Sequence, residues 1–431
     1  MLIEKSRIKV ICLNEKKDFP FAPLEAMGPN ISGWGVVETT LLLPESVCLM
    51  VGPLACLRHS AFMAHARDFF NRFYMLPIDE LDIVMARHLR IIKNAIKEII
   101  LETSPKIFIL SSTCCDHILG TDYKRIIQEI EEEFDIKLIY TVMAPLTIGQ
   151  KPSPFEMAYS ALYEYLKKII GKKVPSRLNI LGNFLPITNT SELYNLCNNL
   201  GLTIYQIPRI NTAEELSLMT TAELNIVIHP LGEILAKKMK KGLGIPFLFV
   251  PVSYGLLEIE QNYKKLSEKL GKYIDYTPYK KEAHNYIAKR LNLLRDKKVA
   301  VGCSIYGNPF ELADALLEYG CDVKAIFCRN APKLFEWQYI KRLKEKSPET
   351  FIYNISHPYL MEKLDVFDDI DISFGVDAGI CCRNSVNVPL SRYKLQTYGF
   401  ENAILLFKEI EKYVSTPIKN YDWIYKHNLL I

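Results

Sequence analysis

The sequence predicts an α/β protein built from three doubly wound, Rossmann-like domains with mainly parallel sheets. Three segments of the chain repeat the same order of elements: a short apolar strand, a turn rich in Gly, Asn or Ser, and an amphipathic helix. The strands are continuous apolar runs, which is typical of parallel sheets buried on both faces. The length of 431 residues, 49% of them hydrophobic, suffices for two or three domains with their own cores.

The repeated pattern also predicts where each domain begins. We expect three domains and a C-terminal tail, with the boundaries 1–172, 173–285, 286–415 and 416–431. The second domain opens on a strand at Leu178–Leu181, and the third on KKVAVGCSIYGNPFELADALLEYG, a strand, a glycine-bearing turn and a helix. Within the first domain, residues 79–103 have apolar positions at helical spacing and predict one long helix.

Composition excludes several classes of protein. The net charge of +4 is small and comes from scattered residues, which predicts neither a nucleic-acid nor a membrane partner. The start, MLIEKSRIKV, is mixed rather than apolar, and no apolar run reaches the length of a membrane span, so we expect a cytoplasmic protein. Eleven cysteines then do not form a disulfide framework. Most should be buried as small hydrophobic residues, among them Cys12, Cys48, Cys197 and Cys321.

Two cysteine motifs in the first domain are candidates for chemistry. VCLMVGPLACLRH is an apolar strand that runs into Gly52-Pro53, with Cys56 on the turn. KIFILSSTCCDHILGTDY is a second strand, followed directly by Cys114 and Cys115. Open α/β sheets bind ligands at the carboxyl ends of their strands, and backbone N–H groups at a helix start favour thiolates. On spacing alone, a pair of buried structural cysteines explains the two motifs at least as well.

The residues around these cysteines resemble those of the nitrogenase component 1 family. GPLAC after one strand and STC after a second match the family's motifs, and the resemblance continues through INTAEELSLMTTAELNIVIHP and PLSRYKLQTYGFENAILLFKEI. The resemblance implies the three-domain fold of that family. It also implies that Cys56 and Cys114 are ligands of an iron–sulfur cluster at a subunit interface, with Cys115 able to replace or supplement Cys114.

The positions at which this sequence differs from the family restrict the type of iron–sulfur cluster that we expect. Nitrogen-reducing members carry a third cluster cysteine ahead of the GPxxC motif, but this chain has Asn30, Ile31 and Ser32 in that region. An eight-iron cluster is therefore not expected, although Ser32 offers an oxygen ligand. Two thiolates from each of two chains make the four that a 4Fe–4S cluster takes. The partner is expected to be a second copy or a similar chain.

The family's molybdenum–iron cofactor is held by a cysteine and a histidine, and the regions LGNFLPITNTSEL and VNVPLSRYKLQTYGF contain neither. A second metallocofactor remains an alternative, with Cys303, Cys381 and Cys382 as its candidate ligands. A packed turn explains the last two better. On the helix beside Cys56, Arg58 and Arg67 line either the docking surface for a reductase or the substrate cavity, or they form surface ion pairs.

The resemblance implies an oxidoreductase that relays electrons from a separate ATP-dependent iron protein to a small-molecule substrate. No GxxxxGK[ST] sequence occurs, so any ATP would be hydrolysed by another subunit. The absent molybdenum ligands favour an organic substrate of tetrapyrrole or thioether type over dinitrogen. Two alternatives stay open: a scaffold or carrier for iron–sulfur cofactor assembly, and a sugar- or nucleotide-binding protein with inert cysteines.

Overall fold

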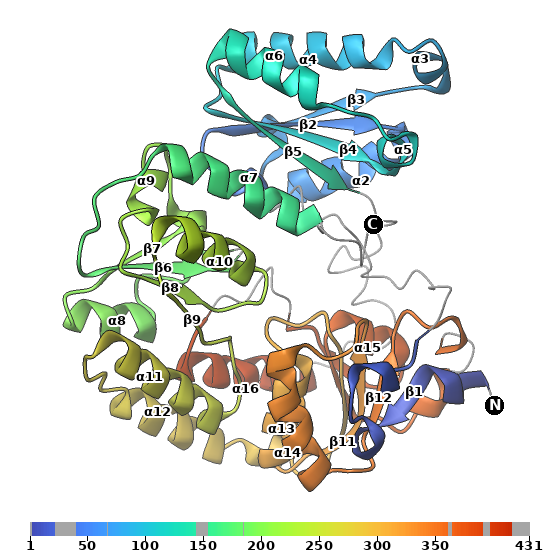
Figure 1. Ribbon diagram of the computed structural model, residues 1–431. Coiled ribbons are helices and arrows are strands. Elements are labelled where there is room, and N and C mark those ends of the chain that lie inside the picture. Colours follow the sequence, from blue (N-terminus) through green and yellow to red (C-terminus); the bar gives the residue numbers. More distant parts are fainter. Residues whose placement is uncertain are drawn as a thin grey trace. The chain divides into compact units, whose positions relative to one another are not determined.

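The structure is a computed structural model that describes residues 2–21, 40–66, 68–143, 154–183, 185–360, 364–390 and 397–415 (Figure 1). The chain forms two compact units, each with its own contacts. One unit contains the described residues of 32–186 and 202–249, and the other those of 1–31, 187–201 and 250–430. Among the described residues, no helix has the length and apolar character needed to cross a membrane.

The cysteine motifs lie on a four-stranded parallel sheet with the order β3-β2-β4-β5. Its strands span Ser46–Gly52 (β2), Phe73–Pro77 (β3), Ile107–Thr113 (β4) and Lys137–Met143 (β5). Every residue of β2 and β4 is buried. Their continuous apolar sequences follow from this burial on both faces, as predicted.

Helices cover both faces of this sheet. Figure 1 shows α4 (His88–Thr103) and α6 (Lys124–Phe134) over one face, where Ile96 and Ile130 join a core with Leu49 and Phe108. On the opposite face, α2 (Leu54–Ala66) and α7 (Pro154–Lys168) contribute to a second core. The short helix α3 (Glu80–Val84) begins shortly after β3, and the short helix α5 (Cys114–Leu119) follows β4 directly.

A second parallel sheet completes this unit. Its order is β7-β6-β8-β9, with strands Arg177–Leu181 (β6), Thr203–Gln206 (β7), Leu224–Val227 (β8) and Phe247–Phe249 (β9). Its helices are α9 (Leu216–Met219) and α10 (Gly232–Leu243). Helix α7 contacts both β5 and α10, so one apolar core continues from the first sheet to the second.

The other unit contains a six-stranded sheet with the order β1-β12-β11-β10-β13-β14. Its strands are Arg7–Lys9 (β1), Lys298–Val301 (β10), Asp322–Cys328 (β11), Phe351–Asn354 (β12), Ile372–Phe374 (β13) and Val386–Val388 (β14). All pairings are parallel except that of β1 with β12. Its helices are α8 (Glu192–Asn199), α11 (Leu256–Leu270), α12 (Thr277–Ala288), α13 (Pro309–Glu318), α14 (Trp337–Lys346), α15 (Val376–Cys381) and α16 (Phe400–Ser415).

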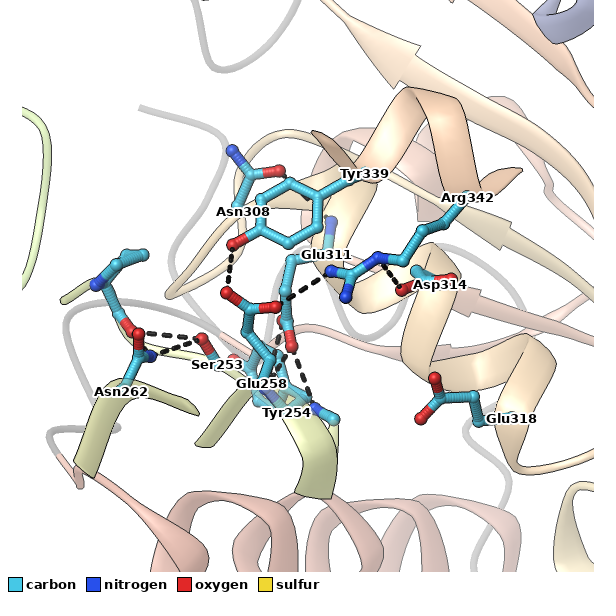
Figure 2. A network of polar contacts seen from close by, with 12 residues as sticks. Ser253, Tyr254, Glu258, Asn262, Asn308, Glu311, Asp314, Glu318, Tyr339 and Arg342 are labelled. Carbon is cyan, nitrogen blue, oxygen red and sulfur yellow. Dashed lines mark hydrogen bonds and ion pairs between the residues drawn. The ribbon is translucent and has the colours of Figure 1, made fainter. Parts of the chain in front are cut away.

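A buried polar network joins three helices of this unit (Figure 2). Glu311, in the first turn of α13, accepts hydrogen bonds from the backbone N–H groups of Tyr254 and Gly255 at 2.9 Å, just ahead of α11. Glu258 of α11 accepts from Arg342 of α14 at 2.9 Å, and Asp314 of α13 pairs with the same guanidinium. Burial raises the pKa of Glu311 to about 8, although the backbone N–H groups act in the opposite direction.

Two expectations from the sequence are wrong in detail. The long helix predicted for residues 79–103 is divided into α3 and α4, and Ala86 between them has a positive φ of 54° that an α-helix does not accommodate. Cys12 is exposed, whereas Cys48, Cys197 and Cys321 are buried as expected. The division into three domains stays a prediction.

Candidate functional site

The two predicted cysteine turns lie at one edge of the first sheet. Cys56 is in the first turn of α2, shortly after β2 ends at Gly52, and Cys114 begins α5 directly after β4. Strands β2 and β4 are parallel neighbours, with Val51 opposite Ser112. The strand order reverses between these two strands, which is where open α/β sheets bind their ligands. The local strand–turn–helix pattern therefore places both cysteines as the sequence predicted.

Gly52 allows the two turns to approach each other closely. A Cβ atom at this position would lie 2.4 Å from Thr113 Oγ1 and 2.5 Å from Thr113 Cγ2. The φ of Gly52 is +152°, a conformation that side-chain-bearing residues rarely adopt. Steric space and backbone conformation thus both require glycine at the end of β2, next to the residue that precedes Cys114.

The thiols at this edge influence one another electrostatically. Partial burial raises the pKa of Cys56, and the nearby Cys114 and Cys115 thiols raise it further. All three side chains are partly buried rather than sealed in the core. A cation relieves the repulsion between neighbouring thiolates, and thiolates are the ligands of iron–sulfur clusters. The three thiols are therefore ligands of the kind that such a cluster takes. Within the described residues of this one chain, no group of three or more His, Cys, Asp or Glu side chains could hold a metal ion.

The sequence did not reveal a group of hydroxyl side chains near the cysteines, which belongs to Ser112, Tyr123 and Tyr140. The Tyr123 hydroxyl donates to Asp116 Oδ1 at 2.6 Å, and the Ser112 and Tyr140 hydroxyls are 2.8 Å apart. The rings of Tyr123 and Tyr140 are in contact, with centroids 5.1 Å apart. In the sequence, the position of Asp116 beside Cys115 was the only sign of a polar group near the cysteines. The contact of Asp116 with Tyr123 could not be predicted, because it depends on the turn of the chain at Gly120.

Exposed apolar side chains surround the cysteine turns. Leu54 precedes Cys56 by two residues, and Ile118 and Leu119 end α5. After the neighbouring strand β3, helix α3 and the residue that follows it expose Leu81, Val84 and Met85. Groups of exposed apolar residues are typical of surfaces that bind another protein. The sequence patterns for these short helices did not reveal this exposure.

The other candidate residues have different surroundings. Cys303 is exposed after β10, and its thiol donates to Asp377 Oδ2 at 3.2 Å. Asp377 also accepts from the Cys303 and Ser304 backbone N–H groups, so it fixes this turn. Cys381 and Cys382 are buried in an apolar core, which favours the packed-turn interpretation.

The basic residues beside Cys56 do not share one role. Arg58 is exposed on α2. Arg72 donates to the backbone carbonyls of Leu41, Leu43 and Ser46, so it supports the start of β2. Arg67 and the region 30–32 lie outside the described residues.

The sequence matches the family described as "Nitrogenase component 1 type Oxidoreductase" over residues 33–396. A nitrogenase iron-molybdenum cofactor biosynthesis protein NifE of Clostridium pasteurianum is 22% identical, over 88% of this chain and 86% of its own length. The nitrogenase molybdenum-iron protein beta chain of the same organism is 20% identical, with 76% and 79% covered. The solved structure "Nitrogenase Cp1 at pH 6.5" superimposes with a TM-score of 0.70 at 16% identity, over 93% of this chain and 94% of that one. The family match covers most of the chain, and this chain belongs to the nitrogenase component 1 type oxidoreductases.

Proposed function

We propose that the chain is the catalytic component of an ATP-dependent reductase. In this proposal, a 4Fe–4S cluster between two chains receives electrons from a separate iron protein and passes them to an organic substrate. The observation that carries the proposal is the position of Cys56 and Cys114 at one sheet edge, next to exposed apolar residues. Free thiols and such clusters persist in reducing compartments, which supports a cytoplasmic location.

Each chain would contribute Cys56 and Cys114, so that a dimer supplies four thiolates. Cys115 is a further donor within the same electrostatic group. Leu54, Ile118 and Leu119 would be covered by the second chain, which removes water from around the cluster. A second copy of this chain and a similar chain both satisfy this geometry.

The electron donor would bind near α3. Leu81, Val84 and Met85 are exposed there, on the helix that follows β3, the strand paired with β2. Because the sequence contains no GxxxxGK[ST] motif, the donor would hydrolyse the ATP. The substrate would be of tetrapyrrole or thioether type, since the sequence regions expected to hold a molybdenum–iron cofactor contain neither cysteine nor histidine.

A second candidate function is favoured by one observation. Several similar proteins are named as nitrogenase iron-molybdenum cofactor biosynthesis proteins. In that alternative, the chain is a scaffold on which a metal cofactor is built and from which it is released. A relay cluster held by four thiolates is retained through many cycles, whereas a cofactor in transit must be released.

Mixing the anaerobically purified protein with its iron protein, MgATP and dithionite distinguishes the two functions. A reductase retains about four irons per dimer, shows cluster reduction only with MgATP, and turns over an organic substrate repeatedly. Transfer of the cluster to an apo-acceptor without ATP-dependent electron uptake would establish the scaffold instead. Protein that binds no iron after anaerobic reconstitution would contradict both.

A further inference from the structure

Asp116 places a buried carboxylate beside the cysteine site. Its side chain is 7% exposed, and Tyr123 is its hydrogen-bond partner, at 2.6 Å. Only one residue separates Asp116 from Cys114, so their Cα atoms are within about 7 Å of each other. Acidic side chains are rarely buried without a cation, and Asp116 forms no ion pair with the described side chains.

The effect of this carboxylate extends beyond its hydrogen-bond partner. Burial raises the pKa of Tyr140, the hydrogen bond with Ser112 lowers it, and the nearby Asp116 carboxylate raises it. The hydroxyl of Tyr140 is paired with Ser112 rather than with Asp116. In the protein interior, where screening by water is weak, the charge of a buried carboxylate acts on groups beyond its hydrogen-bond partner. A cluster held by Cys114 would experience the same interaction.

We propose that Asp116 lowers the reduction potential of the iron–sulfur cluster held by Cys56 and Cys114, an inference that rests on the proposed function. One-electron reduction adds negative charge to a cluster that its thiolates already make anionic. A fixed buried carboxylate nearby stabilises the oxidised cluster relative to the reduced one. The cluster then becomes a stronger donor to an organic substrate, and it requires a strong, ATP-driven reductant.

The chain offers a matched control for this proposal. Asp116→Asn removes the charge but keeps an oxygen that can accept from Tyr123. Asp122→Asn removes the same charge from the loop that follows α5. Asp122 is exposed and accepts only from the Lys124 backbone N–H among its described contacts. Water screens the exposed carboxylate, so its loss should have a much smaller effect.

The test is an anaerobic redox titration of the reconstituted full chain, followed by electron paramagnetic resonance. We expect the midpoint potential to shift to more positive values in Asp116→Asn and to stay close to wild type in Asp122→Asn. Asp116→Ser, a smaller neutral side chain, replaces the amide if circular dichroism shows that Asp116→Asn does not fold. Equal midpoints in wild type and the neutral Asp116 variant would overturn only this inference. A wild-type protein that takes up no cluster would overturn the proposed function as well.

Discussion

Gly52→Ala tests whether the close approach of β2 and β4 holds the cysteine turns together. The new Cβ would lie 2.4 Å from Thr113 Oγ1, far inside van der Waals contact. To accommodate it, the end of β4 must move away from β2, and Cys114 follows Thr113 directly. We therefore expect Gly52→Ala to lower both the stability of the protein and its iron content, although it removes no thiol.

Two costs contribute to the expected loss of stability. A side chain at a φ of +152° costs roughly 1–3 kcal/mol. Overpacking against Thr113 costs about 1–3 kcal/mol more. The free energy of unfolding should thus fall by about 2–6 kcal/mol. Gly120→Ala is the control. Gly120 also has a positive φ, but a Cβ added there would meet no atom of the described chain within 4 Å. We therefore expect Gly120→Ala to cost only the backbone strain, about 1–2 kcal/mol.

Urea unfolding of the iron-free protein measures these losses, and iron analysis after reconstitution measures the effect on the site. Adding Thr113→Ala to Gly52→Ala removes the two closest atoms and leaves only the Cβ of residue 113, at 3.0 Å, so the double variant should recover most of the steric part of the loss. The Thr113 hydroxyl is buried without a hydrogen-bond partner among the described residues, so its own removal should cost little. If Gly52→Ala is no less stable than Gly120→Ala, or if Thr113→Ala recovers nothing, the steric argument is refuted.

Three further predictions concern the cluster ligands and two buried carboxylates. Cys56→Ala and Cys114→Ala should each abolish iron binding. Cys197 is buried in a packing position, so Cys197→Ala should retain full iron and lose roughly 1 kcal/mol of stability. Iron analysis of the three variants checks this prediction. Burial raises the pKa of Glu192 from 4.5 to about 7, so the folded state binds this proton more tightly than the unfolded state. The protonated Glu192 side chain therefore contributes stability below about pH 4.5, and about 3 kcal/mol of it is lost as the pH rises through 7. Urea unfolding measured at several pH values should show this loss, and Glu192→Gln should remove it. Glu311→Ala should cost roughly 2–6 kcal/mol in urea unfolding, because two buried backbone N–H groups lose their acceptor, while Glu311→Gln, which retains one oxygen, should cost clearly less.

The polar groups that complete the site and the fold come from contacts between distant parts of the chain. Glu311 accepts from Tyr254 and Gly255, which precede it by more than fifty residues, and no local pattern predicts that pairing. Asp377 fixes the Cys303 turn over a similar separation. A buried carboxylate needs specific donors, and which donors reach it depends on how the strands and helices are packed.

The sequence by itself predicted the alternation of apolar strands with amphipathic helices and the position of Cys56 and Cys114 near strand ends. This information is local, because hydrophobic periodicity and turn residues act over a few positions. Only the tertiary structure decided that β1 pairs antiparallel with β12, that residues 79–103 break at Ala86, and that Asp116 meets Tyr123 beside the cysteines. The pairing of β1 with β12 joins residues far apart in the sequence, so no local pattern predicts it. The break at Ala86 and the contact of Asp116 with Tyr123 are closer in the sequence, but they depend on the backbone conformation and burial that the folded chain adopts there.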